Sequence, residues 1–389
     1  MSSPLMNVYH RLPVAFTHGE GVWLYDTEGK RYLDALAGIA VNVLGHAHPA
    51  IVEAVCDQAS KLMHTSNVYE IPLQTELAQK LVDLSGLDQA FICSTGAEAA
   101  ECMVKLARMY AHKREIRDPG IIVMEKAFHG RSMATLSASG SRRVQAGFEP
   151  LVQGFIRAPF NDLETIRSIA KHNHHHVVAV MLEPIQGEGG LHVPSPEYLQ
   201  GLRQICDENE WLLMLDEVQS GIGHTGKMFA YEYAGIKPDV LALAKGLGGG
   251  IPIGACLAGG RATDLFEPGN HGSTFGGNPL SCRVALTVLD TLIKNKIIER
   301  VPEVSDYFFK RLREALAGNP HVKDIRGQGL LIGIEMDAPA RPLLYKGLEE
   351  GILFSVTAET VVRLAPALIF TKEDVDYFVE RFARILSMS

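Results

Sequence analysis

Residues 241–250, LALAKGLGGG, set a lysine directly behind an apolar run and a glycine cluster directly behind the lysine. The run over 239–244 is continuous rather than alternating, which is typical of a strand covered on both faces in a mostly parallel sheet. Lysines are rarely buried without a partner, and removal from water lowers the pKa of the amine and frees it for Schiff-base chemistry. Lys245 is therefore a candidate reactive residue; a lysine that emerges at the surface from a strand end is the alternative.

Other apolar runs share this character and alternate with helical stretches. They cover residues 90–93, 120–124, 177–182 and 212–215. Strands that alternate with helices predict an α/β domain with a mostly parallel central sheet. Ligands bind such sheets beyond the carboxyl ends of the strands, so the residues that follow each run are the candidate site.

Small and acidic residues follow two of these runs. Residues 91–98, FICSTGAE, lead into a helix whose free N–H groups and dipole suit a phosphate, with a plain Ser/Thr helix cap as the alternative. Residues 212–219, LLMLDEVQ, end in two acids, and a buried Asp216 needs a cationic or hydrogen-bonding partner. A further small-residue loop, HGSTFGGNP at 271–279, precedes a helical stretch.

Together these segments match the requirements of pyridoxal phosphate. That cofactor needs a lysine for the Schiff base, an acid at the pyridine nitrogen, backbone that binds an anion, and surfaces that pack against the ring. One predicted strand and its connection separate Asp216 from Lys245. We therefore expect both side chains at neighbouring strand ends, facing one crevice.

The two ends of the chain differ from its middle. Strands are predicted at 22–25 and 32–33, around the turn DTEG, and a helix from about Pro49. The last hundred residues predict amphipathic helices at 287–298 and 374–386 and strands at 330–335 and 361–364. We expect a large cofactor-binding domain at 49–282, and one smaller α+β domain built from 1–48 and 283–389.

The composition of the 389-residue chain excludes several classes of protein. Apolar residues make up 47% and charged residues 21%, and 37 Lys and Arg against 45 Asp and Glu give a net charge of −8. Such a chain is neither disordered nor basic enough for a nucleic-acid binder. No apolar run approaches the ~18 residues of a membrane span, and no secretory signal is visible. We expect a cytoplasmic protein with no nucleic-acid or membrane partner.

Several motifs suggest other chemistry but are incomplete. The six cysteines are scattered, which argues against a disulfide framework or a zinc site. GIGHTGK at 221–227 nearly spells a P-loop, but Met228 stands where the hydroxyl is needed. A histidine tract lacks a nearby Cys or carboxylate at ligand spacing, so we expect a solvated turn and no metal; its members are His172, His174, His175 and His176.

Nine ordered motifs carry a family resemblance. They are GEGVWLYDTEGKRYLD (19–34), AGIAVNVLGHAHP (37–49), STGAEAAE (94–101), KAFHGRSMATLSAS (126–139), EPIQGEGG (183–190), DEVQSGIGHTGK (216–227), ALAKGLGGGIPIGA (242–255), HGSTFGGNP (271–279) and VVRLAPAL (361–368). With these motifs the chain resembles the class III, fold type I aminotransferases over nearly its whole length. The resemblance implies the aspartate aminotransferase-like fold. One departure is His224, where many relatives have Arg.

The resemblance also implies roles at the cofactor. Lys245 is the Schiff-base lysine and moves the proton, and Asp216 pairs with the pyridine nitrogen. The implied cofactor-binding set is Gly96, Ala97, Phe128, Asp216, Glu217, Val218, Gln219, Lys245 and Thr274: Gly96 and Ala97 bind the phosphate, Phe128 and Val218 sandwich the ring, and Gln219 sits near the phenolic oxygen. Thr274 of the partner subunit completes the phosphate site, so a homodimer with active sites at its interface is the minimal active unit.

Substrate binding follows from the same resemblance. Arg131, with Ser273 close by, binds a substrate carboxylate. Glu188 and Arg363 resemble a glutamate switch, in which Glu188 masks Arg363 for the amino donor and releases it for 2-oxoglutarate. Arginine suits this task because its planar fork binds carboxylates bidentately. A structural Glu–Arg ion pair is the alternative.

The apolar Ile39 favours an acylated donor, because ornithine-specific relatives carry a tyrosine near this position. The resemblance implies transfer of the ω-amino group of N2-acetyl-L-ornithine to 2-oxoglutarate in arginine biosynthesis, with N-succinyl-diaminopimelate as a second substrate. Succinylornithine, ornithine and 4-aminobutyrate remain alternatives. The rival classes are a nucleotide-dependent enzyme and a non-catalytic sensor of pyridoxal phosphate, and the retained pair Arg131 and Arg363 argues against the sensor.

Overall fold

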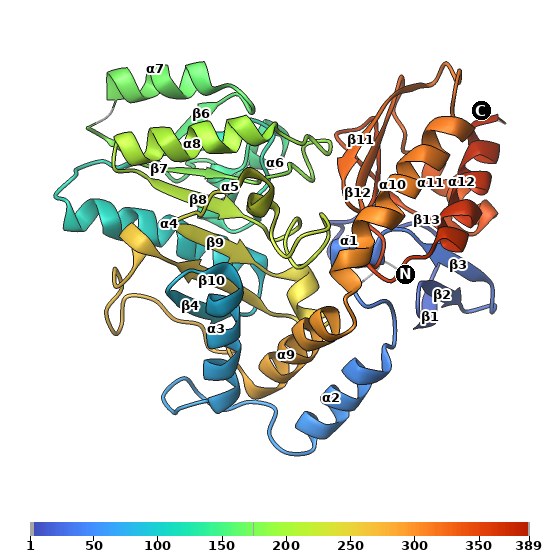
Figure 1. The fold of residues 1–389 in the computed structure, drawn as a ribbon, viewed down its shortest axis with the longest axis horizontal. Helices are drawn as coiled ribbons and strands as arrows, with labels where there is room; N and C mark the ends of the chain where they lie inside the picture. The colour runs from blue at the N-terminus through green and yellow to red at the C-terminus, as the bar shows by residue number, and fades with distance from the viewer. Residues whose placement is uncertain (1–3, 174, 388–389) are drawn as a thin grey trace.

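A mostly parallel sheet forms the centre of the larger lobe in the computed structural model, which describes residues 4–173 and 175–387 (Figure 1). Its strand order is β4-β10-β9-β8-β7-β5-β6, and β10 runs in the opposite direction to the other six strands. The strands are β4 (Gln89–Cys93), β5 (Gly120–Met124), β6 (Phe155–Ala158), β7 (Val177–Leu182), β8 (Leu212–Asp216), β9 (Val240–Leu243) and β10 (Gly254–Ala258). All five predicted runs are strands of this sheet, so the α/β prediction is confirmed.

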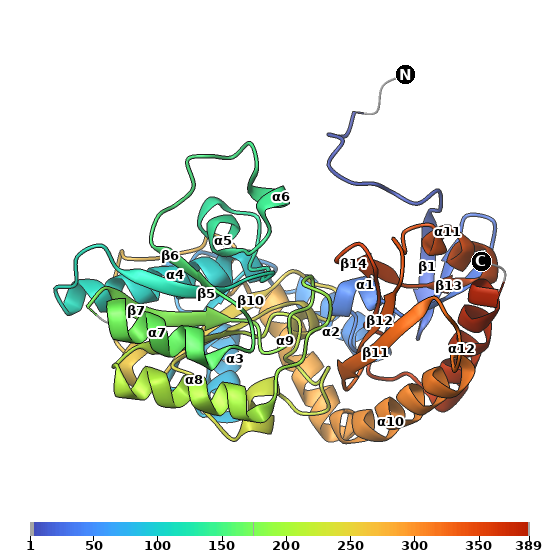
Figure 2. The same ribbon diagram turned by 90° about the horizontal axis from the view of Figure 1, so that it is seen from above.

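Helices cover both faces of the central sheet, which explains the continuous apolar runs (Figure 2). Leu212 and Met214 of β8 pack with the core around α4 (Gly96–Lys113), whereas Leu213 and Leu215 pack with the core that contains α8 (Pro196–Glu208). Successive strand side chains point to opposite faces, so both sets must be apolar. Every residue of β5, β7, β8, β9 and β10 is buried.

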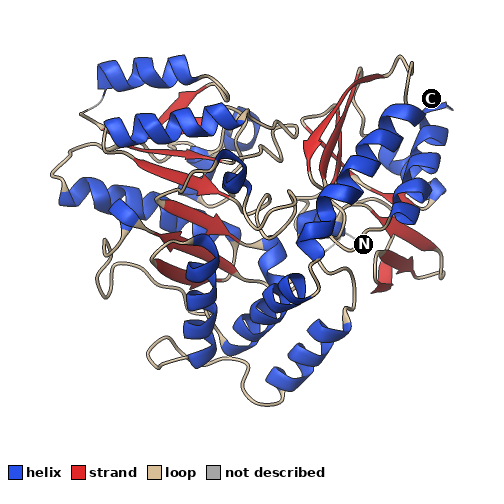
Figure 3. Ribbon diagram, viewed as in Figure 1, coloured by secondary structure: helices blue, strands red, loops and turns tan. Residues whose placement is uncertain are grey.

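Further helices surround this sheet and connect it to the second lobe (Figure 3). They are α1 (Ala37–Ala40), α2 (Pro49–Ala59), α3 (Pro72–Ser85), α5 (Met133–Ala138), α6 (Arg142–Gln145), α7 (Leu163–Asn173), α9 (Pro279–Lys294) and the 3₁₀ helices η1 (Ala230–Ala234), η2 (Lys245–Gly248) and η3 (Gly260–Ala262). None of the helices in the described part of the chain is both long and apolar enough to cross a membrane.

Both ends of the chain build the smaller lobe. One sheet has the order β1-β2-β3-β13, in which β13 (Ile352–Leu353) pairs in parallel with β3 (Arg31–Asp34) beside β1 (Phe16–Glu20) and β2 (Trp23–Asp26). A second, antiparallel sheet has the order β11-β12-β15-β14, with β11 (Val322–Gln328), β12 (Leu331–Met336), β14 (Ser355–Thr357) and β15 (Val361–Leu364). The expected α+β character of this lobe, built from both chain ends, is confirmed.

Three long helices complete the smaller lobe: α10 (Ile297–Ala315), α11 (Leu343–Glu350) and α12 (Lys372–Ser387). The predicted apolar face of α12 is buried as expected, over Val375, Phe378, Val379, Phe382, Ile385 and Leu386. Phe378 meets three other rings, with centroids 5.7 Å from Phe308, 6.3 Å from Phe354 and 5.6 Å from Phe382.

The single helix predicted at 287–298 is wrong. α9 ends at Lys294 and α10 begins at Ile297, because Lys296 adopts a left-handed backbone with φ 51° and redirects the chain. Ile297 and Ile298 continue the apolar pattern but bury their side chains from the new helix. The domain boundaries at 48/49 and 282/283 stay a prediction, and the second falls inside α9.

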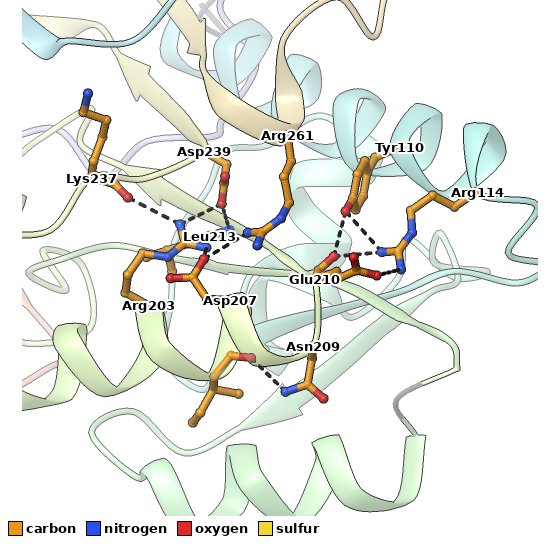
Figure 4. A network of polar contacts seen from close by, with 11 residues as sticks. Tyr110, Arg114, Arg203, Asp207, Asn209, Glu210, Leu213, Lys237, Asp239 and Arg261 are labelled. Carbon is orange, nitrogen blue, oxygen red and sulfur yellow. Dashed lines mark hydrogen bonds and ion pairs between the residues drawn. The ribbon is translucent and has the colours of Figure 1, made fainter.

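A polar network fixes the amino ends of β8 and β9, far from their carboxyl ends (Figure 4). Asp239 Oδ2, just before β9, accepts from Arg203 Nη1 at 2.7 Å and from the Leu213 N–H at 2.8 Å. Asp207 of α8 accepts from Arg203 and from Arg261. These contacts hold the two strands and α8 in register at this edge.

We expect Phe378→Ala to destabilise the protein by about 3–5 kcal/mol, since it empties the centre of a ring cluster. Tyr345→Ala on α11, where the side chain is 46% exposed, should change stability by about 0.5 kcal/mol or less. Denaturant unfolding followed by circular dichroism measures both. Equal effects of the two substitutions would contradict this packing.

Candidate active site

A cavity of about 460 Å³ opens beyond the carboxyl ends of β4, β5, β7, β8 and β9. The strand-end segments that line it contribute Ser94, Thr95, Gly96, Ala97, Phe128, His129, Gly130, Arg131, Glu183, Glu188, Asp216, Val218, Gln219, Ala244 and Lys245. Lys245 and Asp216 thus share one crevice, as the sequence predicted. Val41 also lines the cavity, whereas the predicted Ile39 is not among its lining residues.

Lys245 follows β9 and faces the cavity from the first residue of η2. Burial and then the Arg363 charge lower the pKa of its amine to about 8, against the raising effect of three carboxylates, Glu188, Asp216 and Glu183. Near neutral pH the amine therefore exists in both protonation states. An amine poised in this way can act as a nucleophile, a base and an acid.

Asp216 is the last residue of β8 and is held from two sides. Its Oδ2 lies 2.8 Å from His129 Nδ1, and its Oδ1 accepts from the Val218 N–H at 3.1 Å. Burial alone would lower the pKa of His129, but the hydrogen bond and the charge of Asp216 raise it overall. This arrangement fixes a carboxylate in the cavity and gives it a proton-carrying neighbour.

Glu183, directly after β7, is a further acid on the cavity wall. It accepts from the N–H groups of Phe128 at 2.9 Å and Gly187 at 3.2 Å. Burial raises its pKa to about 7, and the nearby Asp216 adds to the rise. Sequence reasoning missed both Glu183 and His129, although each lies inside a quoted motif, because an isolated polar residue in a loop produces no periodic signal.

The first turn of α4 forms a cradle beside these acids, and its N–H groups suit an anion. Thr95 caps the helix by accepting from the Glu98 N–H at 3.2 Å, and Glu98 in turn accepts from the Ser94 N–H at 2.8 Å. A Cβ on Gly96 would lie 2.8 Å from a methyl group of Val218, so a side chain does not fit there. The first N–H groups of a helix lack partners within it, and Gly96 and Ala97 border the cavity as predicted.

Four predicted residues line the same cavity as the cradle and the lysine. Phe128 and Val218 line the cavity, and the Arg131 guanidinium lies over the Phe128 ring, 5.4 Å from its centroid. Gln219 also lines it, and its buried Oε1 has no hydrogen-bond partner within residues 4–173 and 175–387. An unpaired buried amide oxygen indicates room for a polar ligand.

Glu188 and Arg363 form an ion pair at the boundary of the two lobes, with Oε1 and Nη1 2.5 Å apart. Arg363, on β15, is 2% exposed; Glu188 lines the cavity, whereas Arg363 is not among its lining residues. Burial alone would raise the pKa of Glu188, but Arg363 lowers it overall. Arg363 also donates from Nε to Ser355 Oγ at 3.0 Å.

Four of the predicted residues are not among those that line the cavity of this chain: Arg363, described above, and Glu217, Ser273 and Thr274. Glu217 points to the opposite side of the strand end from Asp216, where it accepts from the N–H groups of Ala230 at 2.7 Å and Tyr231 at 2.9 Å. Ser273 donates to Glu98 at 2.9 Å and, like Thr274, is not among the cavity-lining residues. Glu217 therefore supports the loop behind the site.

The residues of the incomplete P-loop motif and of the histidine tract make contacts within the fold. Lys227 of GIGHTGK lies over the Tyr233 ring at 4.8 Å, and His224 is fully buried with a pKa lowered to about 4 by burial and then by the Lys245 charge. His172 bonds the Ser168 carbonyl, while His174 lies outside the described residues. Among residues 4–173 and 175–387, no group of three or more His, Cys, Asp or Glu could hold a metal ion.

The depressed pKa of Lys245 gives a pH prediction. In cofactor-free protein, the reactivity of Lys245 toward an amine-modifying reagent should rise through a midpoint near pH 8, because the neutral amine reacts. Peptide mass spectrometry quantifies the modification, and exposed lysines of the same protein serve as internal controls, since an ordinary lysine side chain titrates near pH ~10.4. A Lys245 midpoint equal to theirs would contradict the described environment.

Comparison with known proteins agrees with this geometry. The model of the family Aminotransferase class-III matches residues 5–386. The acetylornithine aminotransferase of Nitrosomonas europaea is 52% identical over 385 residues, 99% of this chain and 98% of the relative, and that of Methanocaldococcus jannaschii is 45% identical over 386 residues, 98% and 96%.

Solved structures agree as well. The ornithine aminotransferase of Toxoplasma gondii superposes with a TM-score of 0.95 at 33% identity, covering 99% of this chain and 93% of that one. The acetylornithine aminotransferase of Elizabethkingia anophelis gives 0.89 at 35% identity, covering 99% and 96%. Crystals of the Toxoplasma enzyme grown with oxidized glutathione have partial occupancy of pyridoxal phosphate at the active site. The chain belongs to the class III aminotransferases.

Proposed function

We propose that this aminotransferase moves the ω-amino group of N2-acetyl-L-ornithine to 2-oxoglutarate, giving N-acetyl-L-glutamate 5-semialdehyde and L-glutamate in arginine biosynthesis. Relatives of that name at 52% and 45% identity over nearly the whole chain support the substrate. The observation that carries the proposal is Arg363 masked by Glu188 on the wall of the cavity that holds Lys245. An arginine whose charge can be masked suits an enzyme whose amino donor and 2-oxoglutarate present different groups to the same part of the site.

Class III aminotransferases use pyridoxal phosphate, and the residues of the cavity fit that cofactor. The amine of Lys245 has a depressed pKa, Asp216 supplies a fixed carboxylate, and the start of α4 offers N–H groups to a phosphate. Gln219 brings an unpaired amide oxygen to the same space. When bound, the cofactor supplies an electron sink that stabilises negative charge at the substrate carbon.

Each group of the cavity then has a task. Asp216 holds a proton on the ring nitrogen, and the hydrogen bond from His129 keeps its carboxylate in place. Lys245 accepts a proton at one carbon and returns it at another, since a pKa near 8 allows both steps at physiological pH. Phe128 and Val218 cover the two ring faces and exclude water.

The two arginines bind the carboxylates of the substrates. While Glu188 neutralises Arg363, Arg131, which also lines the cavity, binds the α-carboxylate of the ω-amino donor. For 2-oxoglutarate, Glu188 swings away, Arg363 binds the α-carboxylate, and Arg131 takes the distal one. The net charge of −8 would not attract anionic substrates by itself, so these two side chains must.

Exposed apolar side chains support a homodimer in which Thr274 of the partner subunit completes the phosphate site. Met6 is 85%, Val68 83% and Phe275 63% exposed, and the segment before β1 extends away from the rest of the chain (Figure 2). We assign these side chains to the subunit interface, because assembly buries apolar surface. We place the enzyme in the cytoplasm.

The substrate proposal predicts an order of kcat/KM at fixed 2-oxoglutarate. N-acetylornithine should exceed ornithine and 4-aminobutyrate by at least tenfold, because apolar Val41 lines the cavity and leaves the free α-amino group of ornithine unpaired. Steady-state assays with N-succinylornithine and N-succinyl-diaminopimelate in the same series measure the acyl preference. Ornithine as the best donor would contradict the proposal.

The masked arginine predicts the effect of Glu188→Ala. The cofactor-loaded enzyme should react with glutamate about tenfold faster, equivalent to ~1.4 kcal/mol, since Arg363 no longer has to leave its partner. Single-turnover absorbance changes with glutamate and with N-acetylornithine measure the two half-reactions. Glu303→Ala, which breaks the exposed ion pair with Lys372, is the matched control. No gain for glutamate relative to N-acetylornithine would refute the switch.

A further inference from the structure

The hairpin of β14 and β15 contacts Glu188 through Thr357 and Arg363, and Ser355 accepts a hydrogen bond from Arg363. Ser355 lies directly across from Arg363 in the antiparallel register, and Thr357 stands two residues along the same strand. Residues two apart on a strand share a face, so Ser355, Thr357 and Arg363 belong to one surface. Neither Ser355 nor Thr357 was predicted as a site residue.

Thr357 contacts Glu188 at two points. Its hydroxyl donates in a short hydrogen bond to the Glu188 main-chain carbonyl, and the same Oγ1 lies 3.5 Å from Glu188 Oε2. Thr357 is 5% exposed, so water does not compete for these contacts. The hydroxyl hydrogen bond also helps to lower the pKa of the Glu188 carboxylate.

A second contact holds the same loop to the same lobe. Arg326 of β11 donates from Nε and Nη2 to the Gly190 carbonyl at 3.0 and 2.6 Å. The main chain of the loop is thus held at residue 188 by Thr357 and two residues later, at residue 190, by Arg326. Release of Arg363 must therefore come from rotation of the Glu188 side chain, while the backbone stays in place.

We propose that Thr357 is a positioning residue that holds Glu188 against Arg363, and so sets how strongly the enzyme favours its ω-amino donor over glutamate. The inference rests on the proposed switch. With the backbone held by Thr357, the Glu188 carboxylate keeps Oε1 on Arg363. Without the hydroxyl, Glu188 leaves Arg363 more readily, and the α-carboxylate of glutamate gains access.

The test compares half-reactions of holoenzyme variants by single-turnover absorbance. The readout is kcat/KM for glutamate divided by kcat/KM for whichever ω-amino donor the wild type prefers. Thr357→Val, which replaces the hydroxyl with a methyl group, should raise this ratio about three- to tenfold. Thr357→Ala, a second route to the same loss, should raise it too, and Thr357→Ser should restore the wild-type ratio.

Thr360→Val is the matched control. Thr360 lies in the turn of the same hairpin, and its hydroxyl contacts Glu335 at 3.1 Å instead of Glu188. We expect this variant to keep the wild-type ratio. The double variant Glu188→Ala, Thr357→Val should match Glu188→Ala alone, because Thr357 acts through Glu188.

Three outcomes would overturn this inference, and they differ in what they say of the switch on which it rests. A raised ratio in Glu188→Ala with an unchanged or lowered ratio in Thr357→Val and Thr357→Ala would overturn the role of Thr357 and leave the switch intact. An unchanged ratio in Glu188→Ala would overturn both. An equal rise in Thr360→Val would assign the effect to loosening of the hairpin and would also overturn the role of Thr357.

Discussion

The buried amine of Lys245 is the feature on which the rest of the site depends. A cation removed from water at a strand end is unstable unless acids stand nearby, and Asp216, Glu183 and Glu188 all come from neighbouring strand ends or the loops behind them. Placing them together requires strands that run in one direction and are covered on both faces. The network around Asp239 fixes the other end of β9 and thereby the position of the lysine.

The large lobe supplies a fixed wall of the cavity, whereas the Glu188–Arg363 pair supplies a charge that can be covered or exposed. Asp216, the start of α4 and the residues around Phe128 all belong to the large lobe and are held by main-chain hydrogen bonds. Arg363 belongs to the small lobe and meets the site through Glu188. Cofactor chemistry needs a rigid site, whereas alternation of two substrates needs a charge that can be covered and uncovered. The division between lobes separates these requirements.

Much of this arrangement could be predicted from the sequence. Continuous apolar runs located the strands, and the residues after them located Asp216, Lys245 and the anion cradle. The roles of adjacent residues were harder to predict. Asp216 and Glu217 are both acids at the end of one strand, but side chains alternate along it, so Glu217 lies behind the site. The helix break at Lys296 and the reversed direction of strand β10 depend on tertiary contacts. The hydrogen-bond partners of His129 and Thr357 do so as well. No local sequence pattern predicts any of these features.

The most direct measurement is a crystal structure of the cofactor-loaded enzyme with a non-reacting dicarboxylate analogue of 2-oxoglutarate. We expect continuous density from Lys245 Nζ to the cofactor, Asp216 at its ring nitrogen, and Arg363 bound to the α-carboxylate with Glu188 rotated away. An intact Glu188–Arg363 pair with the analogue held elsewhere would contradict the switch, and a cofactor not joined to Lys245 would contradict the site itself.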